Sequence, residues 1–199
     1  RSGDWKTIAF FSGLAVAGAA VIIAFMPYVA SRFATYRHAW EYAASSGYQQ
    51  TRTMVAIGSG GLFGVGGGNG NLDMVAAADT DLVFGFVSEE WGLLIALCCA
   101  GCLILFALYA VRCASRARSA YFAIAACAAA GMFLFQAALN IFGSTDLLPL
   151  TGVTFPLVSN GGSSMAANFA MLAFIRAVGL ENAGPPAAGK GQVPLNRQA

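Results

Sequence analysis

Charge is scarce in this sequence. Asp, Glu, Lys and Arg make up only 10% of its 199 residues, and 58% of the residues are hydrophobic. An ordinary soluble domain carries about a quarter charged residues, so the composition excludes that class. The formal net charge is only +2, and we expect no nucleic-acid partner.

Residues in a pattern typical of metal sites or disulfides are scarce as well. The chain has one His, His38, and five Cys that lie in or beside apolar runs. Cys99 and Cys102 have C-x-x-C spacing, but no His or second Cys pair lies near them in the sequence. We therefore predict neither a metal site nor a disulfide framework, and we interpret the cysteines as packing residues.

Nucleotide-binding motifs are also missing, although residues 59–70, SGGLFGVGGGNG, include seven glycines. No Lys follows these glycines, as a phosphate-binding Walker A loop requires. Gly64 and Gly66 fit the start of a dinucleotide fingerprint, but Asn69 occupies the place of its last Gly. Two interpretations stay open, namely a turn that packs closely at a membrane surface and a space for a bulky lipid-linked substrate.

Long uncharged runs are what the sequence does contain. A bilayer core of about 30 Å needs about 20 apolar residues in a helix, and none of the runs alternates like a barrel strand. We therefore predict an all-α, polytopic helical membrane protein with about four transmembrane helices and a large extracytoplasmic loop, residues 32–81. The predicted spans are 7–31, 82–111, 119–142 and 161–180.

Basic residues predict the orientation of these spans. The connection between the second and third spans, VRCASRARSA, holds three Arg and no acid, and the positive-inside rule places it in the cytoplasm. With four spans, both termini then lie in the cytoplasm, and loop 32–81 faces outward. Residues 181–199 are rich in Pro, Gly and Ala and are predicted to form a disordered cytoplasmic tail.

The outward loop is too long for a simple connector. Its stretch TRTMVAIGSGGLFG is too short and too rich in glycine to span a membrane, so we expect a half-buried or re-entrant segment. A second outward segment, from about Gly143 to Ser164, is apolar but interrupted by Pro and Gly. It is either a kinked helix start or the wall of a cavity.

Four acids lie within twelve residues near the start of the second span: Asp79, Asp81, Glu89 and Glu90. A carboxylate in a partly apolar groove has a raised pKa, which suits a general base. Alternatively, a helix that begins near Thr80 would have Asp79 and Asp81 at its positive end. Three outward arginines, Arg32, Arg37 and Arg52, are either solvated or bind phosphate.

Three stretches in this order resemble motifs of the SEDS family (shape, elongation, division and sporulation), which includes FtsW, RodA and SpoVE. They are GYQQTRTMVAIGSGGLFGVGGGNG, DTDLVFGFVSEEWG and TGVTFPLVSNGGSS. The resemblance covers about residues 7–180 and implies the C-terminal part of a ten-helix protein. The sequence departs from the family pattern in two places: AAAD stands where the family has Pro-Glu and His before its Thr-Asp, with Asp79 at the His position, and Asn160 stands where it has Tyr.

The resemblance implies a peptidoglycan glycosyltransferase that polymerises lipid II, the undecaprenyl-diphosphate-linked disaccharide-pentapeptide, at the outer face of the bacterial cytoplasmic membrane. Asp81 corresponds to the family's catalytic Asp, and Arg32 and Arg37 are candidates for binding the diphosphate, with or without a divalent cation such as Mg²⁺ or Mn²⁺. A class B penicillin-binding protein is the implied partner. The predicted substrate-binding residues are Gln49, Arg52, Thr80, Glu89, Glu90, Ser159, Gly161, Gly162 and Ser163.

Two other functions remain compatible with these residues. A lipid II flippase would use the same broken helices and charged cavity. A non-catalytic scaffold of a cell-wall synthesis complex is the other, and the departure at Asp79 beside the expected base makes it more plausible. The sequence does not choose between roles in division, elongation and sporulation.

Overall fold

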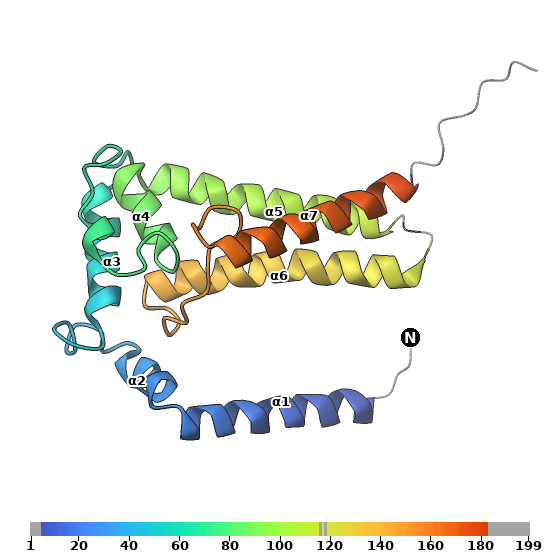
Figure 1. Ribbon diagram of the computed structural model, residues 1–199, viewed down its shortest axis with the longest axis horizontal. Helices are drawn as coiled ribbons and strands as arrows, with labels where there is room; N and C mark the ends of the chain where they lie inside the picture. Colours follow the sequence, from blue (N-terminus) through green and yellow to red (C-terminus); the bar gives the residue numbers. More distant parts are fainter. Residues whose placement is uncertain (1–4, 116, 118, 183–199) are drawn as a thin grey trace, which may run out of the picture.

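The computed structural model describes residues 5–115, 117 and 119–182, and in these ranges all regular structure is helical. Figure 1 shows three long helices side by side, with shorter elements gathered at one end. The elements are α1 (Trp5–Phe25), α2 (Pro27–Thr35), α3 (Tyr48–Gly60), the 3₁₀ turn η1 (Leu72–Met74), α4 (Val83–Glu90), α5 (Leu93–Ser115), α6 (Ala120–Ser144) and α7 (Gly162–Asn182).

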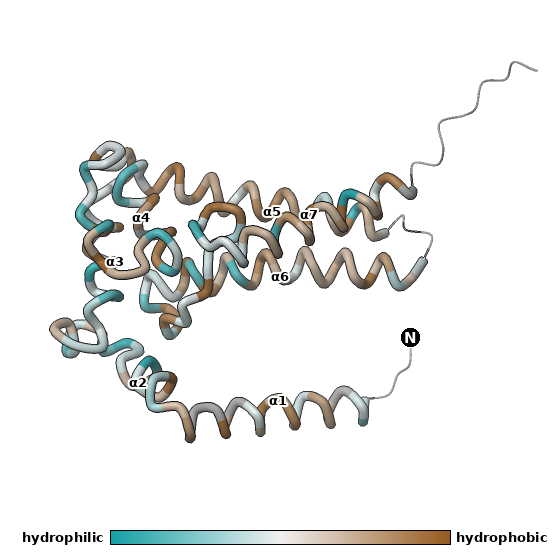
Figure 2. The backbone as a smooth tube through the Cα atoms, viewed as in Figure 1, coloured by the Kyte–Doolittle hydropathy of each residue, from teal (hydrophilic) through white to brown (hydrophobic). Residues whose placement is uncertain are grey.

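Helices α5, α6 and α7 form the bundle. Each is long and apolar enough to cross a membrane, and Figure 2 shows their hydrophobic character along most of their length. Small side chains let the three backbones approach closely, as is usual for helices packed in lipid. The shared core consists of Ala107, Ala110, Ala114, Ala126, Ala130, Phe133, Ile175 and Val178. The protein is therefore a multi-pass helical membrane protein, as predicted.

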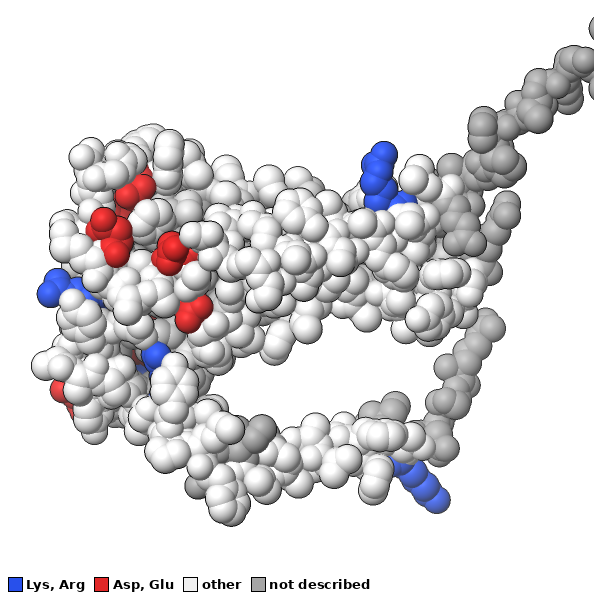
Figure 3. Space-filling model, in the orientation of Figure 1, with Lys and Arg blue, Asp and Glu red and all other residues white. Residues whose placement is uncertain are grey.

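The first predicted span, 7–31, is not one continuous helix. Helix α1 ends at Phe25, and α2 begins at Pro27, whose ring removes the N–H that a continuing helix would need. The 21 residues of α1 rise about 30 Å, enough to cross a bilayer. Figures 1 and 3 show α1 set apart from the bundle. That this first predicted span crosses the membrane, in addition to α5, α6 and α7, therefore stays a prediction.

The second predicted span, 82–111, is two helices. The break between α4 and α5 lies at Gly92, which has a φ of +89° and packs against the backbone of Leu62 and Gly64. A side chain at this position would collide with that backbone, and only glycine adopts such a φ readily. The bundle helix therefore starts at Leu93, and α4 lies with the elements at the end of the bundle.

Helix α3 runs across the end of the bundle rather than into it (Figure 1), and it is half-buried, with five of its 13 residues in the interior. Its buried Gln50 donates from Nε2 to the Gly143 carbonyl and to Asp146 Oδ1, both at 2.9 Å. The Tyr36 hydroxyl donates to the Leu147 carbonyl at 2.9 Å. Loop 32–81 is thus fastened to the segment that follows α6.

Charged side chains separate toward the two ends of the molecule. Figure 3 shows the visible acids gathered at the end that carries α3 and α4, together with basic side chains, and a further basic side chain at the opposite end of the bundle. This separation fits a bilayer across the uncharged middle. The cytoplasmic placement of the termini stays a prediction, since Arg116, Arg118 and residues 183–199 of the expected tail lie outside the described residues.

Candidate functional site

Asp81, the expected base, lies half-buried in the turn before α4. The helix begins at Val83, and its N-cap residue is Leu82, with no side-chain hydrogen bond at the cap. Neither Asp79 nor Asp81 is therefore the N-cap residue, because the helix starts at Val83 rather than near Thr80.

The backbone of this turn is held at three consecutive positions. The carbonyl groups of residues 79–81 each accept a hydrogen bond from α6 or from the segment between α6 and α7. The Asn160 N–H donates to the first at 2.9 Å, the Ser159 hydroxyl to the second at 2.7 Å, and the Asn140 side-chain amide to the third at 2.9 Å. We call this arrangement the three-carbonyl clamp, and it fixes the direction in which the Asp81 side chain leaves the backbone.

Asn140 is the buried centre of the clamp, with only 2% of its surface exposed. Its Nδ2 also donates to the Val153 carbonyl at 2.8 Å, and its Oδ1 accepts from the Phe84 N–H at 3.3 Å. One side chain thereby joins α6, the start of α4 and the segment before α7. The sequence did offer a signal that we missed, a polar amide inside the uncharged run 119–145.

The two departures from the family pattern contact each other. Asn160 donates from Nδ2 to Asp79 Oδ2 at 3.1 Å, in addition to the backbone bond from Asn160 to Asp79. Both side chains are exposed. The two unusual residues therefore act as one hydrogen-bonded pair at the edge of the clamp, which the sequence had presented as separate changes.

Burial raises the pKa of the Asp81 carboxyl above its ordinary value. A hydrogen bond from Thr80 and the positive charge of Arg32 lower this pKa, and the negative charge of Asp79 raises it. Gly152, with a φ of +71°, lies directly against the carboxylate, and a Cβ at this glycine would be 3.1 Å from Asp81 Oδ2. The carboxylate therefore has Gly152 close on one side and the positive charge of Arg32 within its field.

Arg32 is the arginine that the fold brings toward Asp81. Its Nη2 donates to the Tyr28 hydroxyl at 2.8 Å and to Gln49 Oε1 at 2.9 Å, and Gln49 Nε2 donates to the Ala76 carbonyl at 3.0 Å. The predicted residues Arg32 and Gln49 thus lie together. Arg37 lies elsewhere, in an exposed turn where its backbone N–H donates to an Asp146 oxygen at 3.1 Å.

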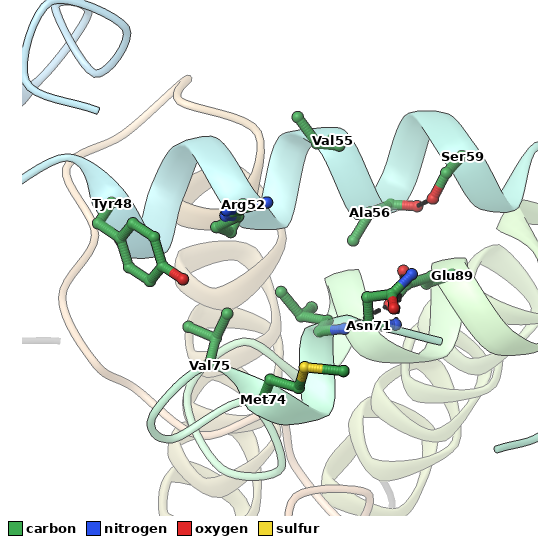
Figure 4. Close-up of a pocket in the computed structure, with 10 residues that line it drawn as sticks. Tyr48, Arg52, Val55, Ala56, Ser59, Asn71, Met74, Val75 and Glu89 are labelled. Atoms are coloured by element: carbon green, nitrogen blue, oxygen red, sulfur yellow. Dashed lines mark hydrogen bonds between the residues drawn. The ribbon is translucent and has the colours of Figure 1, made fainter. Parts of the chain in front are cut away.

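Arg52 and Glu89 line a separate cavity of about 330 Å³ between α3 and η1 (Figure 4). The Arg52 guanidinium lies over the Tyr48 ring, 5.3 Å from its centroid. This is a cation–π contact that leaves the donors of the guanidinium free to bind an anion. The lining residues are Tyr48, Arg52, Val55, Ala56, Ser59, Asn71, Leu72, Met74, Val75 and Glu89.

Glu89 is 3% exposed, and its carboxylate accepts hydrogen bonds from backbone N–H groups, whereas the expected contact with substrate stays a prediction. Its Oε1 accepts from the Asn71 N–H at 3.0 Å and its Oε2 from the Leu72 N–H at 2.9 Å. The carboxylate thereby holds the end of the glycine-rich segment on α4. Glu90 is also buried, at 8% exposed.

Replacing Glu89 by Gln is expected to lower the free energy of unfolding by about 1–3 kcal/mol, because one buried N–H loses its acceptor. Denaturant titration in detergent micelles measures this change, and hydrogen exchange should quicken at the amides of Asn71 and Leu72. Glu90→Gln is the matched control, since the Glu90 carboxylate bonds to no described residue. Equal losses in both variants would contradict the structural role of Glu89.

The remaining predicted residues lie at the start of α7. Ser159 is buried and uses its hydroxyl in the clamp, where it also accepts from the Phe155 N–H at 2.7 Å. Gly161 directly precedes the helix, Gly162 is its first residue, and Ser163 is exposed in its first turn. The fold thus brings Ser159 to the Thr80 carbonyl, next to Asp81, whereas a contact between Ser163 and substrate stays a prediction.

No group of three His, Cys, Asp or Glu side chains in the described ranges is close enough to hold a metal ion. The described donors therefore form no complete metal site of their own. Mg²⁺ usually binds through only one or two carboxylates together with substrate phosphates, so a cation that arrives with the substrate stays a prediction. We therefore assign no catalytic step to a metal.

The sequence profile of the FtsW, RodA and SpoVE family, described as a cell cycle protein, matches residues 2–183. The chain belongs to this family. The resemblance to this family is thereby confirmed.

Relatives within the FtsW/RodA/SpoVE family carry the name probable peptidoglycan glycosyltransferase FtsW. The protein from Marinobacter nauticus is 37% identical over 174 residues, which cover 85% of this chain and 44% of the relative. The Halomonas elongata protein is 36% identical over 89% of this chain and 46% of the relative. The Coxiella burnetii protein is 33% identical over 83% and 46%, respectively. The chain spans about half the length of the curated relatives it matches.

Proposed function

We propose that this chain contributes the catalytic aspartate of a peptidoglycan glycosyltransferase that polymerises lipid II. The observation that carries the proposal is the Asp81 turn. A half-buried carboxylate is fixed through the three-carbonyl clamp at one end of a membrane bundle and lies in the field of Arg32. The names of the relatives supply the reaction class.

In the proposed reaction, Asp81 accepts the proton of the 4-hydroxyl group on the acceptor GlcNAc. The hydroxyl oxygen attacks C1 of the donor sugar from the face opposite the leaving group. The bond from C1 to the phosphate oxygen breaks, and its electron pair leaves with the lipid diphosphate. An α-linked donor thereby becomes a β-1,4 bond, and no nucleotide is consumed.

Negative charge develops on the departing diphosphate, and Arg32 is the residue that we assign to stabilise it. An arginine fork binds phosphate oxygens bidentately, and Gln49 and Tyr28 hold the Arg32 side chain in place. Arg52, in its own cavity, is suited to a more distant anionic part of the substrate. The position of Arg37 in an exposed turn makes it the weakest candidate.

The end of the bundle that carries Asp81 is assigned to the outer face of the cytoplasmic membrane, where lipid II is polymerised. The acids at this end and the arginines of the connection after α5 support that orientation. A class B penicillin-binding protein, which would cross-link the new strand, is the proposed partner.

Incubation of the full-length protein with purified lipid II tests the function. Glycan strands should form on one side of reconstituted vesicles and be cleaved by a muramidase. Movement of labelled lipid II across the bilayer without strand growth would favour a flippase. Partner recruitment with neither activity would favour a scaffold.

The charges around Asp81 predict opposite pH shifts in two variants. The base must be ionised, so activity rises with pH through its pKa. Arg32→Gln removes a charge that lowers this pKa, so the acidic limb of the rate profile should move to higher pH. Asp79→Asn removes a charge that raises the pKa and should move the limb to lower pH.

Polymerisation rates measured across pH check this prediction, with Arg32→Lys as the control that keeps the positive charge. Asp79→Asn retains a side-chain oxygen that can accept from Asn160, so the pair need not be lost. Shifts in the same direction for Arg32→Gln and Asp79→Asn would show that Asp81 does not set the acidic limb.

A further inference from the structure

The turn between α3 and η1 presents an unusually apolar tip. Its side chains are largely exposed: Phe63 has 83% of its surface accessible, Leu62 61% and Val65 41%. Trp91, 53% exposed, packs against the same turn, since a Cβ at Gly67 would be 3.4 Å from its ring. We call Leu62, Phe63, Val65 and Trp91 the apolar tip. No charged residue occurs from position 53 to position 72.

The apolar tip is held rigidly by backbone hydrogen bonds. The Gly64 N–H donates to the Gly60 carbonyl at 2.8 Å, and the N–H groups of Val65 and Gly66 donate to the carbonyls of Glu89 and Glu90 at 2.9 and 3.0 Å. Gly64 has a φ of +81° and packs against the Glu90 backbone, where no side chain fits. The glycines therefore clip the turn to the end of α4, so that Leu62 and Phe63 project from a fixed base.

The same turn covers the start of a bundle helix. The Leu93 N–H donates to the Gly61 carbonyl at 3.0 Å, and the Leu94 N–H donates to the Leu62 carbonyl at 3.3 Å. These amides have no partner within their own helix, and the turn satisfies them. The apolar tip therefore lies at the first turn of α5, directly beside the place where the membrane-crossing part of the chain begins (Figure 1).

Exposed apolar side chains continue from the tip along α5. Leu94 is 57% exposed and Leu97 is 54% exposed, and both lie on a helix that is long and apolar enough to cross a membrane. A contiguous exposed apolar surface marks an interaction site, and Trp is enriched at the level of the lipid headgroups. The exposed apolar surface of the tip therefore lies next to the exposed apolar side chains at the start of α5.

We propose that the apolar tip inserts into the interfacial layer of the bilayer and binds lipid, which makes the glycine-rich turn a membrane anchor. Charges are absent from the turn because it lies in this layer, although it is surrounded by acids at the same end of the molecule. The anchor sets the depth of the α4 end relative to the lipid surface. This inference does not rest on the proposed enzymatic activity.

Photocrosslinking tests the anchor in the full-length protein, reconstituted in vesicles of phosphatidylethanolamine and phosphatidylglycerol. Benzoylphenylalanine replaces Phe63 by amber suppression, because the probe keeps the aromatic ring. The control carries the probe at Glu41, an exposed acid in the loop between α2 and α3. Mass spectrometry of the irradiated peptides identifies what each probe has captured.

Phospholipid adducts should form at position 63 with a yield several-fold above that at position 41. Adducts at position 63 to a polypeptide, whether a further segment of this protein or another chain, would overturn the proposal, as would equal lipid yields at both positions. As a second measurement, Phe63→Trp in a background with the three native Trp replaced by Phe should be quenched by brominated lipids. Fluorescence that responds only to aqueous iodide would likewise overturn the proposal.

Discussion

Asp81→Asn is expected to abolish the polymerisation of lipid II by the full-length protein. The amide is isosteric with the carboxylate but cannot accept a proton at neutral pH, and loss of a general base lowers the rate by about 10²–10⁴-fold. Gel analysis of glycan strands made from purified lipid II measures the loss. The binding of lipid II should change much less than the rate, because the shape of the site is kept.

Asp73→Asn is the matched control for this variant. Asp73 lies in η1 on the same loop and is exposed, so its replacement should leave polymerisation unchanged. Equal thermal stability of both variants in detergent would show that the Asp81 effect is chemical. Strand synthesis by Asp81→Asn at the rate of the native protein would remove Asp81 from the mechanism.

Asn140→Ala is expected to have the second-largest effect, because it removes the centre of the three-carbonyl clamp. The carbonyls of Asp81 and Val153 lose their donor, and the Phe84 N–H loses its acceptor. Each buried polar group left without a partner costs about 1–3 kcal/mol. The free energy of unfolding should fall, and the turnover rate should fall further than the loss of folded protein explains, since the base is no longer positioned.

Asn168→Ala separates this positioning role from general helix packing. Asn168 is as deeply buried as Asn140, but its only hydrogen bond within the described residues is a 3.5 Å contact from Nδ2 to Ser164. Its variant should keep most of the activity. Normal turnover per folded molecule in Asn140→Ala would contradict the positioning role of the clamp. An equal loss of turnover in Asn140→Ala and Asn168→Ala would contradict it as well.

The membrane character of the fold could be predicted from the sequence because it depends on local composition. Runs without charge and about 20 residues or longer force helices across a bilayer, since backbone groups in lipid need partners within their own segment. Helix α6 was therefore predicted closely. The helix ends at Phe25 and Glu90 were missed, because a Pro or Gly inside an apolar run breaks a helix only when neighbouring backbone requires it.

The role of the glycine-rich segment could be predicted only in part. The missing Lys excluded a nucleotide loop, and a close-packed turn was one of the interpretations that remained. The contacts of Gly64 and Gly92 with neighbouring backbone identify where that packing occurs. Neither the projection of Phe63 nor its place beside the first turn of α5 follows from the local pattern, because both depend on how α4 folds back on α3.

The sequence by itself determined the class of the protein, the family and the identity of Asp81 as the leading candidate base, since each is encoded in runs or motifs of consecutive residues. Tertiary structure decided which residues share its surroundings. Asn140 is 59 positions from Asp81 in the chain, and Ser159 is 79 positions from Thr80. Only helix packing brings such residues together. The hydrogen bonds that the Glu89 carboxylate accepts from backbone amides are likewise visible only in the folded structure.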